Sequence, residues 1–171
     1  MNLRLSILLA CTLILPLAAV QARAPADPRA EITRQVRAVL LRDDMSEHDP
    51  AVIAAQVTPI DINGDGIQDW QVDWNMLGMQ WCGTGGCRYQ LWLGRKAGPP
   101  LKVFDRRVRD RKVETRDGRI LFVFDFHGTH CGGYGAQECP GTFTWNAKRG
   151  RMVLVPMPGK STRNNQAIER F

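Results

Sequence analysis

The sequence predicts one α+β domain, in which an N-terminal helix packs on a mainly antiparallel β-sheet and disulfides brace the loops. Three observations lead to this class. One segment with helical spacing of apolar residues precedes short segments in which apolar and polar residues alternate with period two. Glycine- and proline-rich turns separate these segments, and no internal repeat is visible. Cysteines at positions 82, 87, 131 and 139 bracket glycine-rich loops, as in many exported domains.

The first 24 residues have the pattern of a signal peptide. A short positive start, Met1–Arg4, precedes the apolar run Leu5–Val20 and the small-x-small cleavage site Ala22-Arg23-Ala24. Cleavage after Ala24 leaves a single domain over residues 25–171, with a polar tail from about residue 156 that we expect to be frayed. The predicted location is the periplasm or the extracellular medium, and the processed chain is not expected to span a membrane.

Cys11 offers an alternative N-terminus. It follows Leu8-Leu9-Ala10, a loose form of a lipobox, and lipidation there would anchor the chain as a lipoprotein. The apolar run continues past Cys11 to Val20, which favours ordinary secretion.

The segment Glu31–Leu41 is predicted to form an amphipathic helix. Its apolar residues share one side and its arginines the other, with Ile32, Val36, Val39 and Leu40 opposite Arg34, Arg37 and Arg42. Acidic residues at Asp43-Asp44 and the segment Ser46–Pro50 end it. The apolar stripe is short and lacks aromatic residues, so we expect it to pack on a sheet rather than lie on a membrane.

From Ala51 onward the chain is predicted to be mainly β. The expected strand segments are Ala51–Ile60, Trp70–Met76, Arg88–Leu93, Leu101–Phe104, Val108–Thr115, Arg119–Phe126, Thr142–Trp145 and Arg151–Val155. Asp117-Gly118 is a strong signal for a tight hairpin turn. Arg119–Phe126 is apolar on both sides, which predicts a central strand.

The stretch Asp61–Asp69 places oxygen-bearing side chains at alternate positions of a tight turn. Asp61, Asn63, Asp65 and Asp69 occupy odd positions, with Gly64 and Gly66 between them. Calcium takes six to eight oxygen ligands from carboxylates, amides and carbonyls. An EF-hand would need a glutamate at the twelfth position, which is Val72 here, so we reject a helix–loop–helix.

A D-x-N-x-D-G-x-x-D loop that leads directly into a strand resembles the calcium loops of FG-GAP and VCBS-type β repeats. The resemblance implies calcium as the ligand, held by Asp61, Asn63, Asp65, the carbonyl of Ile67, and Asp69. The motif occurs once, and a propeller needs several blades, so the resemblance extends to the loop and not to that fold. The alternative is an Asx-rich surface turn without metal.

Four cysteines remain after cleavage, and an even number in an exported chain predicts disulfides. We favour the local pairs Cys82–Cys87 and Cys131–Cys139, because each brackets a glycine-rich loop. Pairing between the two loops is the alternative if they lie at the same end of the sheet. A four-cysteine zinc site is disfavoured by the wide second spacing and by the oxidising compartment.

The overall layout resembles small exported bacterial proteins of unassigned activity. They share an acidic loop, then a CGxxGC turn, and a late HGxxC…C segment before an aromatic strand. Here those pieces are Asp61–Asp69, Cys82–Cys87, His127–Cys131 with Cys139, and Thr142–Trp145. The resemblance implies fold and compartment, and it carries no activity.

His127 and His130 are the candidate catalytic residues if the chain is an enzyme. With Asp125 or Glu138 they could hold a transition metal or act as an acid–base pair in a hydrolase. The flanking glycines indicate a loop rather than a helical metal motif, and no serine lies in a nucleophile-elbow context. A structural role for both histidines is favoured.

The segment Lys102–Arg119 holds eight basic and four acidic residues. Removing Arg4 and Arg23 with the signal peptide leaves 21 basic against 17 acidic residues, a net charge of +4. A patch of this sign could bind an anionic glycan, a lipid or an acidic envelope protein. The favoured alternative is a solvated face of two hairpin strands, and nucleic acid is not an expected partner because no aromatic residues alternate with the cations.

The function predicted from these features is an exported calcium-binding module with a structural or partner-binding role in the cell envelope. An inhibitor or immunity-type protein is one form of this role. A histidine- or metal-assisted hydrolase centred on His127 and His130 is the alternative, and a non-enzymatic role is favoured.

Overall fold

The computed structural model describes residues 27–43, 48–135 and 137–156. The predicted signal peptide, Cys11 and the predicted frayed tail beyond residue 156 lie outside these residues. The α-helices are α1 (Pro28–Arg42) and α2 (Pro50–Ala55). The strands are β1 (Val57–Ile60), β2 (Asp69–Asp73), β3 (Cys82–Gly83), β4 (Gly86–Leu93), β5 (Leu101–Val108), β6 (Asp110–Arg116), β7 (Arg119–Phe126), β8 (Cys139–Asn146) and β9 (Arg151–Leu154).

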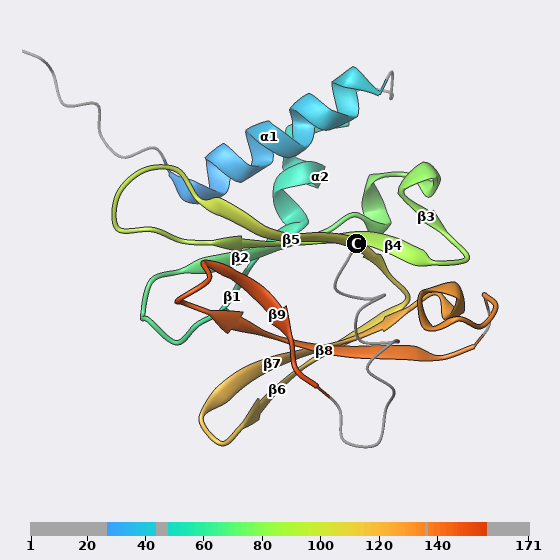
Figure 1. Ribbon diagram of the computed structural model, residues 1–171. Helices are drawn as coiled ribbons and strands as arrows, with labels where there is room; N and C mark the ends of the chain where they lie inside the picture. Colours follow the sequence, from blue (N-terminus) through green and yellow to red (C-terminus); the bar gives the residue numbers. More distant parts are fainter. Residues whose placement is uncertain (1–26, 44–47, 136, 157–171) are drawn as a thin grey trace, which may run out of the picture.

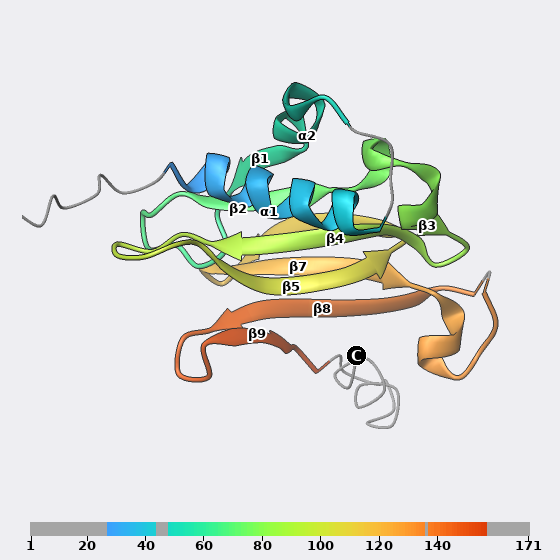
Figure 2. The ribbon, with the colours of Figure 1, turned by 90° about the horizontal axis from the view of Figure 1, so that it is seen from above.

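Two antiparallel sheets lie face to face, and the helices cover the outer face of the first sheet (Figures 1 and 2). The first sheet has the order β1-β2-β4-β3, with β5 on the other edge of β4, and the second has the order β6-β7-β8-β9. The predicted α+β class is therefore confirmed, with the β-segments divided between two sheets. Neither α-helix in the described part of the chain is long and apolar enough to cross a membrane.

Helix α1 begins three residues earlier than predicted. Asp27 caps it by accepting a hydrogen bond from the backbone N–H of Arg29 at 3.0 Å, and Pro28 occupies the first turn. The predicted apolar stripe is buried at Ile32, Val36 and Leu40. These side chains form one core with residues from the outer face of the first sheet, including Val57, Val72, Trp74 and Trp92.

Helix α2 corrects the prediction of β-structure from Ala51. Asp49 accepts a hydrogen bond from the backbone N–H of Ala51 at 2.8 Å, and Pro50 again stands in the first turn. The strand begins only at Val57, where pairing with β2 becomes available. The Asp-Pro pair was the helix-start signal that the prediction missed.

A second core lies between the two sheets and is mainly aromatic. Phe124 is at its centre, with its ring centroid 4.5 Å from that of Phe104 and 5.7 Å from that of Tyr89. It also contacts Phe126 and Phe143. The predicted central strand β7, which carries Phe124, pairs with β6 on one side and β8 on the other.

Three other strand predictions differ in extent. β2 ends at Asp73, whose carboxylate accepts from the backbone N–H of Asn75 at 3.0 Å and starts a 3-10 turn over Asn75–Leu77. β5 is continuous over Leu101–Val108, and only Arg109 separates it from β6 in the other sheet. β8 starts at Cys139, three residues before the predicted strand.

The turn at Asp117-Gly118 has the predicted form. Both residues have positive φ, 51° and 72°, as a two-residue type I′ hairpin requires. A Cβ at Gly118 would meet no atom within 4 Å, so crowding does not explain the glycine. Its positive φ does, because residues other than glycine rarely adopt that conformation.

Both local disulfides are present, Cys82–Cys87 and Cys131–Cys139. The two loops lie at the same end of the sandwich, where Thr84 Oγ1 is 3.4 Å from His127 Nε2 (Figure 2). The cysteines nevertheless pair within each loop rather than between loops. Because all four are oxidised, they cannot serve as thiolate ligands for zinc.

The disulfide pattern predicts that the processed, unreduced protein contains no reactive thiol. Thiol titration under denaturing conditions should give no signal before reduction and four thiols after it. A reactive thiol before reduction would contradict the pairing.

Truncation of Phe124 should cost about 3–5 kcal/mol of unfolding free energy, because the Phe124→Ala change leaves a cavity among five aromatic neighbours. Val123→Ala, one residue away on the opposite face of β7, is the matched control and should cost less because Val123 is only half-buried. Denaturant unfolding measures both. Equal losses would mean that the aromatic core is not where the stability lies.

Candidate metal-binding loop

The loop between β1 and β2 is closed by the last ladder pair, Ile60 opposite Asp69. Gly64 and Gly66 have φ values of +73° and +77°. A Cβ at either position would meet no atom within 4 Å, so backbone conformation rather than crowding favours glycine there. The two glycines allow the chain to reverse within the loop and bring alternate side chains onto its inner side.

Successive Asx turns organise the first half of the loop. Asp61 Oδ1 accepts hydrogen bonds from the backbone N–H groups of Asn63, at 3.1 Å, and Gly64, at 2.7 Å. Asn63 Oδ1 accepts from Asp65 N at 3.1 Å, and Asp65 Oδ1 accepts from Ile67 N at 2.8 Å. A carboxylate has about four acceptor sites, so these bonds leave acceptor capacity on Asp61 and Asp65.

Asp69 is the buried member of the predicted ligand set, with 0 % of its surface exposed. Its Oδ2 accepts from the backbone N–H of Ile62 at 2.8 Å, and its Oδ1 accepts from Gly94 N at 2.7 Å. Burial raises the pKa of Asp69, the two hydrogen bonds oppose that rise, and the nearby Asp65 and Asp61 add to it. Asp69 therefore ties the loop to the connection after β4 at an electrostatic cost.

Gly94 is a residue of this site that the sequence analysis missed. A Cβ on it would lie 2.2 Å from the carbonyl oxygen of Gln68, so only glycine allows the two connections to approach. The only signal in the sequence is that this glycine directly follows the predicted strand Arg88–Leu93. Nothing in the sequence indicates that it bonds to Asp69, 25 positions earlier.

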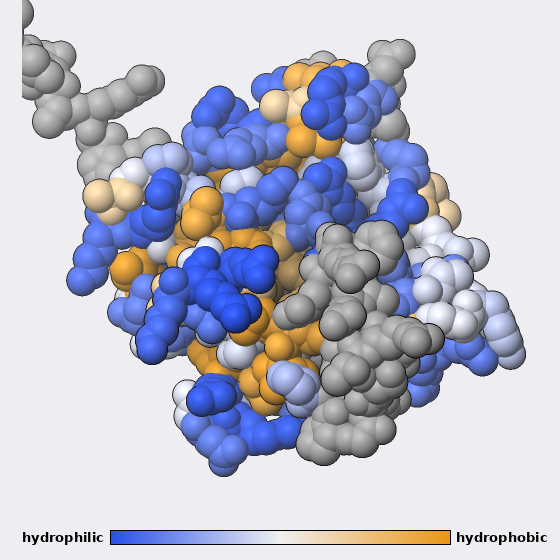
Figure 3. Space-filling view, in the orientation of Figure 1, coloured by the Kyte–Doolittle hydropathy of each residue, from blue (hydrophilic) through white to orange (hydrophobic). Residues whose placement is uncertain are grey.

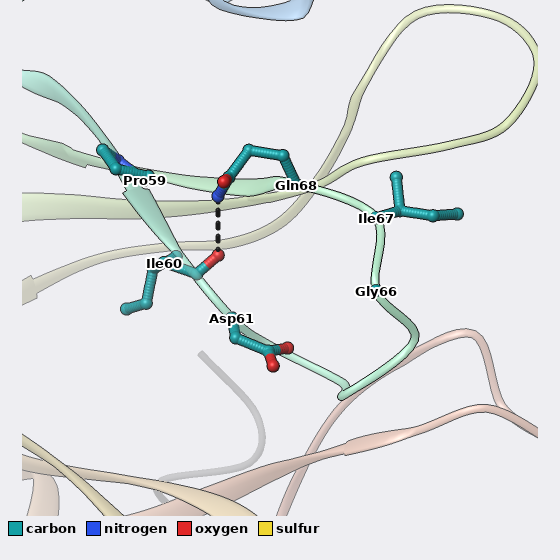
Figure 4. A pocket seen from close by; sticks show the side chains of 6 residues that line it. All are labelled: Pro59, Ile60, Asp61, Gly66, Ile67 and Gln68. Atoms are coloured by element: carbon teal, nitrogen blue, oxygen red, sulfur yellow. Dashed lines mark hydrogen bonds between the residues drawn. The ribbon is translucent and has the colours of Figure 1, made fainter.

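The two isoleucines of the loop have different places. Ile62 is 1 % exposed and joins the core between the sheets, so it anchors the loop to the domain. Ile67, the predicted carbonyl ligand, is half-buried, and its side chain points away from Asp61 (Figure 4). An open hollow of about 370 Å³ lies inside the loop, lined by Pro59, Ile60, Asp61, Gly66, Ile67 and Gln68.

None of the three loop carboxylates, Asp61, Asp65 and Asp69, forms an ion pair with a lysine or arginine of the described chain. Several other acidic residues of the sheets, namely Asp73, Asp105, Glu114 and Asp125, have such partners, as Asp105 does with Arg88 at 2.7 Å. The loop therefore holds negative charge that no protein cation neutralises.

The donors are all oxygen atoms, which fits a hard cation such as calcium and not a thiolate- or imidazole-binding metal. Within residues 27–43, 48–135 and 137–156, no three His, Cys, Asp or Glu side chains converge as a metal-binding group. The predicted set contains three such side chains, Asp61, Asp65 and Asp69, so this structure does not bring its carboxylates together around one point. The chemistry of the donor set nevertheless fits calcium.

The histidines lie at the other end of the sandwich, in the disulfide loops. Both ring nitrogens of His127 face hydroxyl groups, Nδ1 at 2.8 Å from Thr129 Oγ1 and Nε2 at 3.4 Å from Thr84 Oγ1. The His130 ring lies edge-on to Phe126. Among the described residues, His127 makes no hydrogen bond or ion pair with a carboxylate.

The two acidic residues proposed to assist these histidines are placed elsewhere. Asp125 accepts from Cys139 N at 2.8 Å and lies 3.5 Å from Arg109 Nε, while Glu138 is exposed. Arg109, which the sequence analysis did not single out, also donates from Nη1 to the carbonyl oxygens of Gly135 and Gln137, both at 3.1 Å. It holds the second disulfide loop against β5 and β6.

The basic segment Lys102–Arg119 runs through both sheets rather than forming one surface. Most of its cations have partners: Lys102 with Asp105, Arg109 with Asp125, Arg111 with Asp73, and Lys112 and Arg116 with Glu114. Arg107 donates to the carbonyl oxygen of Gln80 at 3.1 Å. Most of the positive charge of the segment Lys102–Arg119 is therefore paired with acidic residues of the same domain.

The surroundings of His130 predict a pH-dependent stability. Burial lowers the pKa of His130, and the positive charges of His127 and Arg106 lower it further. Below the unfolded-state pKa near 6.5, the unfolded chain takes up a proton before the folded chain does, so the free energy of unfolding should fall as the pH falls from 7 to about 5. His130→Gln should reduce this slope, whereas His48→Gln, outside the disulfide loops, should keep it. An unchanged slope in His130→Gln would contradict the assignment.

Comparison with models of protein families, with curated proteins and with solved structures finds no match. What the chain does therefore has to be inferred from the chemistry of its own side chains.

Proposed function

We propose that this chain is an exported calcium-binding module with a structural or partner-binding role in the cell envelope. One observation carries the proposal: three carboxylates of a single loop, one of them fully buried, have no cation from the described chain to neutralise them. A divalent cation held by Asp61, Asn63, Asp65, the Ile67 carbonyl and Asp69 would supply that charge. The two disulfides are consistent with an oxidising, exported environment.

Calcium would act on the fold through Asp69. The ionised form of this carboxylate is disfavoured by burial and by Asp65 and Asp61. A bound cation would favour the ionised form and so strengthen its hydrogen bonds to Ile62 and Gly94. The ion would thereby stiffen the β1–β2 loop together with the start of the β4–β5 connection.

A binding role is supported by the surface near the disulfide loops. Met76 and Met79 are 66 % and 84 % exposed in the turns that precede Cys82, and Tyr134 is 68 % exposed in the loop closed by Cys131 and Cys139. Large exposed apolar side chains in and beside disulfide-closed loops can form part of a protein contact surface. An inhibitor or immunity-type protein would present its contact loops in this way. The alternative of a hydrolase centred on His127 and His130 lacks support at His127, whose ring nitrogens face hydroxyl groups rather than a carboxylate.

Calcium should raise the melting temperature of the processed protein. At a free calcium concentration one hundred times the dissociation constant, the gain in unfolding free energy is about 2.7 kcal/mol. Asp65→Asn removes one ligand charge while keeping the oxygen that accepts from Ile67 N, so it should remove most of the calcium-dependent shift. Scanning calorimetry in calcium, in magnesium and in chelator measures this shift.

Asp117→Asn is the matched control for that experiment. It makes the same change of charge in another exposed turn, and asparagine tolerates the positive φ of 51° at that position. It should keep the full calcium shift. A shift of equal size in the two variants, or none in the parent protein, would refute the calcium proposal.

A further inference from the structure

A groove lies on the other side of the calcium loop, where two hairpins diverge. The ladder between β7 and β8 ends at the pair Phe122–Phe143, so the first residues of β7 and the last residues of β8 separate beyond it. Thr144 Oγ1 bridges the base of this fork by donating to the carbonyl oxygen of Ile120 at 2.9 Å. The turn Ile62–Gly64 forms one wall, and the groove has a volume of about 620 Å³.

The lining of the groove is mainly aliphatic and aromatic. Ile62 and Leu154 contribute from the edge of the inter-sheet core, and the half-buried Ile120, Trp145 and Val153 line the rest. Figure 3 shows hydrophobic surface between the hydrophilic tips at this end of the molecule. Contact with these apolar side chains favours a hydrocarbon body, while the polar side chains Asn63, Thr144 and Asn146 also line the groove.

Two cations stand at the tips of the fork. Arg119 follows the turn of the β6–β7 hairpin, Lys148 lies in the turn of the β8–β9 hairpin, and both line the groove. Both are exposed, and neither side chain forms an ion pair or hydrogen bond with another residue of the described chain. By contrast, Lys112 and Arg116, which lie in the same hairpin as Arg119, both form ion pairs with Glu114.

We propose that this groove binds an amphipathic anion, namely an acyl chain that ends in a carboxylate or phosphate. The hydrocarbon lies against Ile120, Trp145 and Leu154, and the anionic head group lies between Arg119 and Lys148. Two cations on separate hairpins can approach one head group from both sides, and charge-assisted hydrogen bonds of this kind are about twice as strong as neutral ones. The groove shares one wall residue, Asn63, with the proposed calcium ligands, but its two cations and its apolar lining are not among those ligands, and the site does not require calcium.

Isothermal calorimetry with decanoate, below its micelle concentration and in chelator to prevent calcium soaps, tests the proposal. The parent protein should bind decanoate at one site per chain. The double variant Arg119→Gln/Lys148→Gln should bind it about tenfold more weakly, because both charged contacts are lost. The neutral analogue 1-decanol should bind the parent protein and this variant equally, since the apolar lining is unchanged.

The matched control is Arg149→Gln/Arg151→Gln, which removes the same charge from exposed positions beside the groove that do not line it. It should bind decanoate as the parent does. Absence of saturable binding, or an equal loss in both double variants, would overturn the proposal. Binding to vesicles of phosphatidylglycerol without binding to free decanoate would also overturn it, in favour of a charged membrane-binding surface. Because no arm contains calcium, failure here leaves the calcium proposal unaffected.

Discussion

The buried carboxylate of Asp69 is the interaction on which this end of the molecule depends. Its two oxygens join backbone N–H groups from separate connections, one before β2 and one after β4. An unpaired buried donor costs about 1–3 kcal/mol, so each of these N–H groups needs its acceptor. Burial and the neighbouring Asp65 and Asp61 disfavour the ionised form of Asp69, whereas the two hydrogen bonds favour it. The position of the loop, of Ile62 in the core and of one wall of the groove all follow from this tie.

The two ends of the sandwich are held together by different means. At the disulfide end, two covalent links and the guanidinium of Arg109 hold glycine-rich segments that have little apolar surface of their own. At the other end, the connections are held by hydrogen bonds to carboxylates and by one buried isoleucine. The restraints at this second end include uncompensated carboxylates that a cation could neutralise, so we place the proposed calcium site there.

Local signals made much of the fold predictable from the sequence. The apolar stripe of α1, the Asp117-Gly118 turn, the central position of β7 and the two local disulfides each depend on residues close together in the chain. Two wrong predictions have local causes too. The Asp-Pro helix start before α2 was not recognised, and β2 ends at Asp73, whose carboxylate accepts a hydrogen bond from the backbone N–H of Asn75. The division into two sheets was not predictable, because it depends on long-range pairing. β5 pairs with β4 in the first sheet, whereas β6 pairs with β7 in the second.

The candidate site was predictable only in part for the same reason. The spacing of Asp61, Asn63, Asp65 and Asp69 marks the loop, but it does not show that Asp69 bonds to Gly94 or that its charge is uncompensated. The groove between the hairpins has no sequence signature, since its lining comes from three separate connections. In the sequence, Arg119 and Lys148 look like the other cations of the hairpins. Only the structure shows that Lys112 and Arg116 pair with Glu114.

The strand order also bears on how the chain acquires its structure. Most ladders join strands that are consecutive along the chain, and β2 with β4 is the exception, separated by the short β3. Such short sequence separations keep the contact order low for a β-rich domain, which favours rapid assembly. The strands can therefore pair early in folding, and the register of β3 with β4 places Cys82 opposite Cys87. The backbone register would then guide the oxidation, instead of the cross-links guiding the fold.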